Sequence, residues 1–243
     1  MSYTWNWGIF LEPSPEGVGS YAWTLLLGLR ATLATAFGAW LLALLLGSIV
    51  GVLRTLPSRF PQAVSTAYVE AFRNVPLLVQ LFLWYFVLPE LLPRAAGLWL
   101  KQQPDAAFWT AVVGLGFYMS ARVAEQLRAG IGALPRGQRL AGTALGLTTR
   151  QTYAYVLLPM AYRLILPPLT SEFLNTIKNT SVALTIGLVE LTARARAMQE
   201  YSFQVFEAFT GATILYLLIN LTVVYTMHAL EAKLAVPGYT AAR

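Results

Sequence analysis

Apolar residues in this chain form long runs, and charged residues separate these runs instead of alternating within them. A membrane-spanning helix needs about 20 predominantly apolar residues, which several of the runs supply or approach. We therefore expect about five transmembrane helices. The expected spans are residues 31–53, 67–88, 106–121, 164–189 and 208–230.

The composition agrees with burial in lipid. Of the 243 residues, 57% are hydrophobic and 12% are charged, and the mean hydropathy is +0.57. Soluble domains carry about 25% charged residues. We expect an all-α integral membrane protein with one transmembrane domain over residues 21–233. Residues 1–20 and 234–243 are expected to lie outside the membrane, as a periplasmic segment and a cytoplasmic tail.

Basic residues collect in alternate connections. The segment before Arg30 contains Glu12 and Glu16 but no lysine or arginine. The connections after the first and third spans are rich in arginine, namely Arg54, Arg59 and Arg73 in one and Arg128, Arg136, Arg139, Arg150 and Arg163 in or beside the other. Because Lys and Arg favour cytoplasmic loops, we predict an outer N-terminus and an inner C-terminus. The net charge of +6 lies in these loops and does not indicate a nucleic-acid partner.

Few residues of this chain suit catalysis or metal binding. It has no cysteine, which excludes disulfides and thiolate chemistry, and its one histidine, His228, cannot build a histidine-rich metal site. None of its three lysines follows a GxxxxG sequence, so it has no phosphate-binding loop. We expect no enzyme activity, no cofactor and no metal in this chain, and any ATP-driven work must come from another subunit.

Two spacings indicate contacts that helices can make. Gly47 and Gly51 in the first span have GxxxG spacing, which permits close helix packing, although glycine is also common in membrane helices generally. Glu70 and Arg73 are spaced for a structural ion pair near the inner interface.

The long arginine-rich connection predicts two short helices joined by a tight turn at Gly146, the second ending near Pro159. A short helix there can enter a groove on a cytoplasmic partner and pass rigid-body motion to the neighbouring spans. The segment resembles the ATPase-docking loop of ABC importer permeases, which reads EAA, three residues, Gly, nine residues, Ile, one residue, Leu-Pro. All spacings are kept here, with Leu140 in place of the Glu, Gly142 in place of the second Ala and Val156 in place of the Ile.

Further segments, within residues from about 20 to 233, resemble the polar amino-acid branch of this family. They are YVEAFRNVPL at 68–77, LPPL at 166–169 and KNTS at 178–181. The segments WNWGIF, LRTLPSRF, LPELLP and VLLPMAYR are most similar to the glutamate/aspartate importer permeases. The resemblance implies the type I importer fold of a methionine permease, multi-pass in the bacterial inner membrane.

The resemblance also implies partners and roles. ABC ATPase subunits, expected as a homodimer, would use ATP and Mg²⁺, and a periplasmic amino-acid-binding protein would deliver the substrate. A second permease chain is expected to be related but different, although an identical chain remains open. The coupling loop spans about 138–159, and the matching positions in and beside it are Gly137, Gln138, Ala141, Gly142, Gly146, Leu158 and Pro159.

Charges that continue the third span are candidate pathway residues, because ionisable groups in a membrane usually face a cavity or a partner. Arg122, Glu125 and Arg128 share one helix face and can form an ion-pair ladder. Related permeases usually have Ala-Tyr-x-Ala-Glu where this chain has Ala-Arg-Val-Ala-Glu. Arg122 either binds the side-chain carboxylate of an acidic amino acid, or only pairs with Glu125 or Glu172.

The fourth run is interrupted by Pro167 and Pro168, which lack amide donors and so free backbone carbonyls. Broken helices at membrane depth are tolerated where they line a cavity. The candidates for lining this part of the pathway are Lys178, Asn179, Thr180 and Ser181. Alternatively, Lys178 pairs with Glu172 or caps a neighbouring helix.

We predict the permease subunit of an ATP-driven importer that moves glutamate or aspartate by alternating access. One alternative is a permease for another polar amino acid, such as glutamine or asparagine. Another is an ion-coupled secondary transporter, which usually contains internal repeats and a whole substrate site in one chain. An intramembrane enzyme would need a matched nucleophile and base. Neither a repeat nor such a motif is visible in the sequence.

Overall fold

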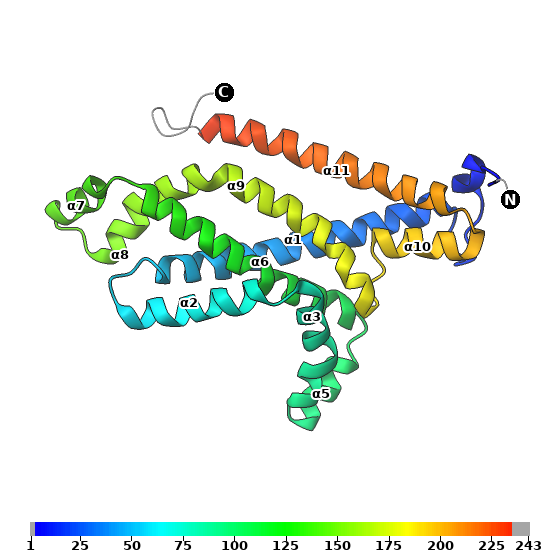
Figure 1. Ribbon diagram of the computed structural model, residues 1–243, viewed down its shortest axis with the longest axis horizontal. Coiled ribbons are helices and arrows are strands. Elements are labelled where there is room, and N and C mark those ends of the chain that lie inside the picture. The colour runs from blue at the N-terminus through cyan, green and yellow to red at the C-terminus, as the bar shows by residue number, and fades with distance from the viewer. Residues whose placement is uncertain (1–2, 235–243) are drawn as a thin grey trace. The chain divides into compact units, whose positions relative to one another are not determined.

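The computed structural model describes residues 3–234, and the chain is helical along most of that length (Figure 1). In this described range, β-structure is limited to one isolated bridge between Pro13 and Ser20. The elements are η1 (Trp7–Leu11), α1 (Tyr21–Leu53), α2 (Arg59–Asn74), α3 (Leu77–Phe82), η2 (Leu83–Val87), α4 (Leu88–Leu91), α5 (Arg94–Lys101), α6 (Ala106–Ala133), α7 (Arg136–Ala144), α8 (Thr149–Thr152), η3 (Tyr153–Leu157), α9 (Leu158–Asn179), η4 (Thr180–Ile186), α10 (Leu191–Ser202) and α11 (Val205–Leu234). Of the four η elements, η1 and η4 are 3-10 helices, whereas η2 and η3 are π-helices.

The chain forms two compact units. Unit 1 contains Met1–Trp40, Pro76–Gly116 and Asn175–Thr222, and unit 2 contains Leu41–Val75, Phe117–Leu174 and Val223–Arg243. Four of the five dividing points fall inside α1, α6, α9 and α11, so each of these helices contributes residues to both units, and the fifth falls between α2 and α3. Nearly all of the expected cytoplasmic tail, residues 234–243, lies outside the described residues.

Among residues 3–234, three helices, α1, α6 and α11, are long and apolar enough to cross a membrane. They contain the expected spans 31–53, 106–121 and 208–230 and extend beyond each of them. α1 begins at Tyr21, because the single charge of Arg30 does not end a helix whose other residues are uncharged. A fourth candidate is broken, since α2 and the stretch Leu77–Leu91 qualify only as a pair.

The expected span at 67–88 is therefore not one helix. α2 ends at Asn74, Val75 is extended with φ −97° and ψ 129°, and α3 begins at Leu77. Pro76 explains this break, because a proline ring disfavours the helical conformation of the residue before it.

The expected fourth span, 164–189, also differs from the structure. α9 continues through Pro167 and Pro168 and ends at Asn179, where η4 begins, so the interruption predicted at the proline pair is wrong. Two residues before Pro167, Ile165 packs so closely on Gly130 of α6 that a Cβ on the glycine would lie 2.4 Å from Ile165 Cγ2. This packing helps to hold the helix despite the missing amide donors. α9 is not among the candidate spans by length and composition, so its depth in a membrane stays a prediction.

In unit 2, the backbone of α1 at Gly47 and Gly51, the glycines of the GxxxG motif, packs directly against α6. A Cβ on Gly47 would lie 2.6 Å from the Cβ of Val123, and one on Gly51 would lie 2.9 Å from the carbonyl oxygen of Ala124. Small residues allow such an approach and gain van der Waals contact along the helix pair. The close-packing explanation of this motif is confirmed, and α6 is the partner.

In unit 1, a buried carboxylate caps the start of α10. Glu190 is 0% exposed and accepts hydrogen bonds from the backbone amides of Thr192 and Ala193 at 3.0 and 2.8 Å. It also accepts a hydrogen bond from the hydroxyl of Tyr216 in α11 at 2.9 Å. These donors offset the cost of removing the carboxylate from water, and they join α10 to α11.

The N-terminal segment of unit 1 is attached to the start of α11. The buried Glu207 accepts hydrogen bonds from the backbone amide of Asn6 at 2.8 Å and from the hydroxyl of Tyr3. Desolvation and this hydrogen bond raise the pKa of the Tyr3 phenol. The segment before α1 is therefore part of the packed unit.

Candidate substrate pathway and coupling segment

Three arginines surround the carboxylate of Glu125 in unit 2. Glu125 Oε1 accepts a hydrogen bond from Arg128 Nε at 2.9 Å, while Oε2 pairs with Arg54. Arg73 Nη1 lies 3.9 Å from the same Oε2. The side chains of Arg54 and Glu125 are 13% and 26% exposed, so the pair is largely shielded. The cluster holds two positive charges in excess, and its only carboxylate is already occupied.

This cluster changes two expectations about ion pairs. The predicted pair of Glu125 with Arg128 is confirmed, but Arg122 does not join a ladder with them. The predicted pair of Glu70 with Arg73 is wrong. Glu70 instead accepts a hydrogen bond from the side-chain amide of Asn74 at 2.7 Å, one helical turn away. Arg73 is drawn to Glu125, because that carboxylate is more shielded from water and so attracts charge more strongly.

Arg122 makes only loose contacts. Its Nη2 donates a hydrogen bond to the hydroxyl of Tyr118 at 3.1 Å, and the guanidinium lies 5.3 Å from the centre of that ring. Its Nη1 is 3.8 Å from Glu172 Oε2, which is longer than a hydrogen bond. A guanidinium has five N–H donors, so within the described part of the chain most of them have no hydrogen-bond acceptor. The side chain is 40% exposed, which leaves room for an anion.

Lys178, Asn179, Thr180 and Ser181 lie in unit 1, where α9 passes into η4. The hydroxyls of Thr180 and Ser181 donate to the carbonyls of Ile177 and Lys178, both at 2.7 Å. These bonds satisfy carbonyls at the end of α9, and Thr180 is buried. Lys178 is exposed, and no ion pair to it occurs among residues 3–234. Lys178 is the only charged residue of the four, and its side chain is exposed.

The coupling segment contains the predicted turn at Gly146. α7 ends at Ala144, and Gly146 has φ +75°, a left-handed conformation that a side chain disfavours. The amide of Gly146 donates to the carbonyl of Thr143, and the amide of Leu147 to that of Gly142, both at 3.0 Å. This is the Schellman arrangement that closes helices at a glycine. The expected short helix and tight turn are confirmed.

The second half of the segment departs from the expectation. Thr148 caps α8 in a reciprocal capping box with Gln151, but the helical course does not end near Pro159. It continues through the π-helix η3 into α9, so Pro159 lies inside a continuous helical stretch. α7 and α8 meet at Gly142, where a Cβ would lie 3.0 Å from Thr152 Cγ2. Leu140 and Leu145 of this loop expose their side chains.

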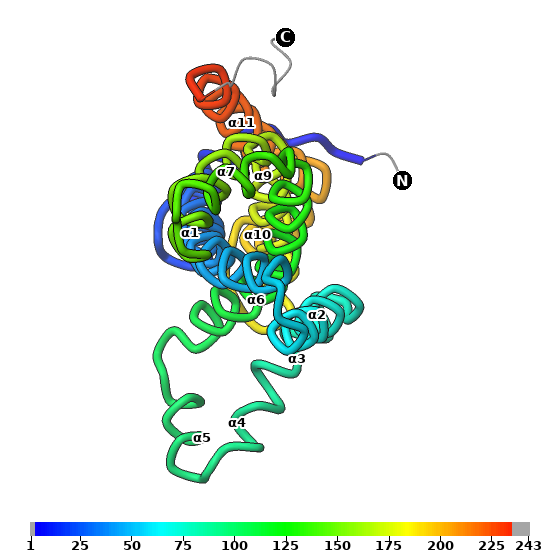
Figure 2. Tube along the Cα trace, turned by 90° about the vertical axis from the view of Figure 1, so that its left-hand side faces the viewer, coloured from blue at the N-terminus to red at the C-terminus, as the bar shows by residue number. Residues whose placement is uncertain are grey.

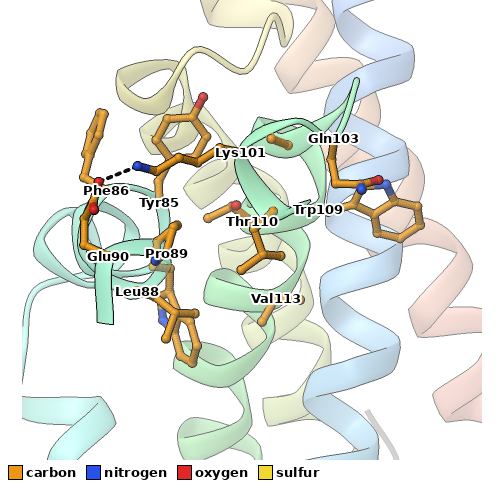
Figure 3. Close-up of a pocket in the computed structure, with 13 residues that line it drawn as sticks. Tyr85, Phe86, Leu88, Pro89, Glu90, Lys101, Gln103, Trp109, Thr110 and Val113 are labelled. Carbon is orange, nitrogen blue, oxygen red and sulfur yellow. Dashed lines mark hydrogen bonds and ion pairs between the residues drawn. The ribbon is translucent and has the colours of Figure 1, made fainter. Parts of the chain in front are cut away.

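A pocket of about 420 Å³ in unit 1 was not foreseen from the sequence (Figure 3). Tyr85, Phe86 and Trp109 form aromatic walls, and the ion pair of Lys101 with Glu90 lies at its side. The pocket is shaped by η2, α4, α5 and the start of α6, and α4 lies next to α5 (Figure 2). Gly97 makes this possible, because a Cβ there would lie 2.1 Å from the carbonyl oxygen of Pro89.

Sequence reasoning also missed Arg54 and Arg73 as partners of Glu125, and Tyr118, one turn away on the same helix, as the partner of Arg122. Arg54 is 71 residues from Glu125, so no spacing rule joins them. The signal that was available is the balance of charges, since Glu125 is the last acid before Glu172 and arginines outnumber acids around it.

Known proteins resemble this chain over almost its whole length. The sequence profile of the family described as "Binding-protein-dependent transport system inner membrane component" matches residues 16–236. The glutamate/aspartate import permease protein GltJ of Escherichia coli K12 is 48% identical over 241 residues, which cover 98% of each chain.

Solved structures share the fold. A crystal structure of an amino acid ABC transporter with histidines superimposes with a TM-score of 0.74 and 31% identity, covering 88% of this chain and 95% of that one. An inward-facing structure of the MetNI methionine ABC transporter gives a TM-score of 0.75, with 19% identity, 88% coverage of this chain and 97% of that one. The expectation of a methionine-permease-like fold is confirmed. The chain belongs to the family of binding-protein-dependent transport system inner membrane components, as the permease subunit of an ABC importer.

Proposed function

We propose that this chain is the permease subunit of an ATP-driven importer of glutamate and aspartate in the bacterial inner membrane. The observation that carries this proposal is the 48% identity to a glutamate/aspartate import permease over 98% of both chains. The aligned 241 residues include both the charged helix α6 and the coupling segment, which supports the candidate residues in both.

Family membership implies an ATPase and a binding protein as partners. For this importer we infer two identical ATPase subunits that use ATP and Mg²⁺, a periplasmic amino-acid-binding protein, and a second permease chain that is related but not identical. Residues 1–20 would face the periplasm and residues 234–243 the cytoplasm, because the arginine-rich connections favour the inner side.

Alternating access would proceed through the coupling segment at about 138–159. α7 is rigidly closed by the turn at Gly146, and it exposes Leu140 and Leu145 for packing in an ATPase groove. Movement of the ATPase would carry α7 with it. α7 packs against α8 at Gly142 and Thr152, and α8 runs through η3 into α9. The motion would therefore reach the membrane helices directly.

Arg122 would contact the side-chain carboxylate of the substrate. Its guanidinium has one hydrogen bond to Tyr118 and a loose approach to Glu172, so a substrate carboxylate finds free donors in a planar fork. The arginines around Glu125 add positive charge to the same unit, which favours an anion over a neutral amide. In unit 1, the exposed Lys178 would line the pathway with Asn179 and Ser181, while the buried Thr180 would support the turn.

The test is uptake by the complete importer in proteoliposomes, with labelled glutamate, aspartate, glutamine and asparagine. We expect ATP-dependent uptake of the two acids. Arg122→Tyr should lower the uptake of the acids by at least about ten-fold, since a charge-assisted hydrogen bond is worth about 1.5–3 kcal/mol. Arg122→Lys, which keeps the charge but loses the fork, should give an intermediate rate.

Three results would contradict the proposal in different ways. Uptake driven by an ion gradient without the ATPase would remove the importer mechanism. A preference for glutamine or asparagine would make the chain a permease for another polar amino acid. Unchanged uptake of the acids by Arg122→Tyr would leave the importer standing but would reduce Arg122 to a structural residue.

A further inference from the structure

A second, smaller pocket lies at the base of the coupling segment, in unit 2. Its volume is about 230 Å³, and four parts of the chain line it: the connection after α1, the end of α6, the start of α7, and η3. Leu134, Tyr153 and Leu157 are buried and form an apolar floor. The hydroxyl of Tyr153 donates to the carbonyl of Thr55 at 2.8 Å, which fixes one wall. Buried side chains and a hydrogen bond therefore fix the shape of the pocket on these sides.

Two arginines stand on the remaining side of this pocket. Arg136 and Arg139 lie three residues apart in the first turn and a half of α7, and both are exposed. Within residues 3–234 neither makes an ion pair, and the sequence has no acid between Glu125 and Glu172. Two neighbouring cations at a helix N-terminus repel each other and oppose the helix dipole. An anion between them would remove both costs.

The place of the pocket limits which anion can reach it. Thr55 follows the end of α1 by two residues, and Leu134 follows α6 directly. α1 is long and apolar enough to span a membrane and carries no charge from Ala31 to Leu53, so its end marks the level of the headgroups. The surrounding arginines predict the cytoplasmic side, where anionic phospholipids attract basic pockets between helices.

We propose that this pocket binds the phosphate of an anionic phospholipid from the inner leaflet. Arg136 and Arg139 would hold the phosphate oxygens, which the planar guanidinium groups match in geometry. The apolar part of the lipid would run along Leu134 and Leu157. The volume accommodates a phosphate group, because it equals that of several water molecules at about 30 Å³ each.

A bound lipid would act on coupling. The pocket joins the end of α1, the end of α6 and the start of α7, so one phosphate would tie the docking helix to two spans. Transport should then need anionic lipid, whichever polar amino acid is carried. The site goes beyond the proposed substrate and does not depend on it.

The experiment uses the complete importer, purified with its natural subunits and placed in nanodiscs of phosphatidylethanolamine with or without phosphatidylglycerol. Lipid retained by the complex is measured by native mass spectrometry, and ATP-driven uptake is measured in matching liposomes. Each basic residue near an anionic surface contributes about five-fold in affinity, so Arg136→Gln with Arg139→Gln should weaken phosphatidylglycerol retention about 30-fold. Uptake should lose its stimulation by phosphatidylglycerol.

Two controls accompany this variant. Arg150→Gln removes an arginine of the same loop that does not line the pocket, so lipid retention should stay unchanged. Arg136→Lys with Arg139→Lys keeps both charges and should restore most of the retention, which also guards against misfolding of the glutamine variant.

Equal retention of phosphatidylglycerol by the wild type and the double glutamine variant would overturn the proposal. Displacement of the lipid by inorganic phosphate, with full uptake in liposomes of phosphatidylethanolamine alone, would assign the site to free phosphate instead. Loss of the ATPase from the double variant with lipid retention intact would show that these arginines contact the motor subunit.

Discussion

Ionisable side chains in this protein are accommodated by donors from several elements. Glu125 is reached by arginines that follow α1, end α2 and lie one turn further along α6. Glu190 is reached by two backbone amides and a tyrosine hydroxyl. Glu125 thereby joins elements that are distant in the sequence, and Glu190 also accepts a hydrogen bond from the hydroxyl of Thr32 in α1 at 3.4 Å. Removal of either carboxylate would leave buried donors or charges without a counterpart.

Glu125→Gln should destabilise the protein strongly. The amide cannot neutralise Arg54, Arg73 and Arg128, and breaking a shielded ion pair on one side typically costs about 3–5 kcal/mol. We expect a clearly lower melting temperature of the detergent-solubilised importer.

The matched control for this change is Glu70→Gln, because Glu70 only accepts one exposed hydrogen bond from Asn74. It should change stability by less than about 0.5 kcal/mol. Equal melting temperatures for the two variants would show that the arginine cluster does not need its carboxylate.

Helices of this protein contact each other at glycines, and the position of each glycine decides what it contributes. Gly47 and Gly51 let α1 approach α6, whereas Gly146 supplies a backbone conformation that ends α7. The first role depends on space and the second on the sign of φ. Substitution of either kind of glycine by alanine therefore tests its role. At Gly47 the new methyl group meets a steric clash, and at Gly146 it strains the backbone.

Gly47→Ala should weaken the contact between α1 and α6. The new Cβ would lie 2.7 Å from the carbonyl oxygen of Ser120, so the helices must separate, at a cost of about 1–3 kcal/mol. The melting temperature should fall, and Gly132→Ala in α6, where the new Cβ meets nothing within 4 Å, should not lower it. A neutral Gly47→Ala would mean that the helix pair can open there without loss.

Gly146→Ala should impair coupling more than folding. A left-handed residue with a Cβ costs about 1–2 kcal/mol, so α7 would end differently and lose its fixed angle to α8. ATP-driven uptake should fall several-fold, and Gly146→Asn should lie between, since asparagine tolerates this conformation. Gly137→Ala inside α7, with open space around it, should be neutral or slightly stabilising. Normal uptake by Gly146→Ala would show that coupling does not require the left-handed turn at Gly146.

How much of this could be predicted from the sequence depends on the range of the forces involved. The turn at Gly146 follows from local chemistry and was predicted. The break at Val75 is equally local, and the Pro76 signal was present but was outweighed by the apolar run. The continuity of α9 through Pro167 and Pro168 was not predictable, because it depends on packing against α6. The contacts of Arg54 and Arg73 with Glu125 were not predictable either, because they also depend on how the helices pack.

At the scale of the whole molecule, the coupling segment and the N-terminal segment should face opposite sides of the membrane. The coupling segment exposes Leu145, which is 80% exposed, and the N-terminal η1 exposes Leu11, which is 83% exposed. Both side chains are apolar, and both belong to short connecting elements. Only the inner one should meet the ATPase, so the two leucines form a matched pair for testing sidedness and assembly together.

Leu145→Asp should release the ATPase from the purified importer, and Leu11→Asp should not. Burying a leucine in a partner groove is worth about 1.5–3 kcal/mol, so the affinity should fall at least about ten-fold. The measurement is the amount of ATPase retained on a tagged permease in detergent, with the melting temperature as a check on folding. Neither side chain is packed in this chain, so both variants should melt like the wild type. Full ATPase retention by Leu145→Asp would place the docking contact elsewhere on the loop, and loss by Leu11→Asp would reverse the orientation that the arginines predict.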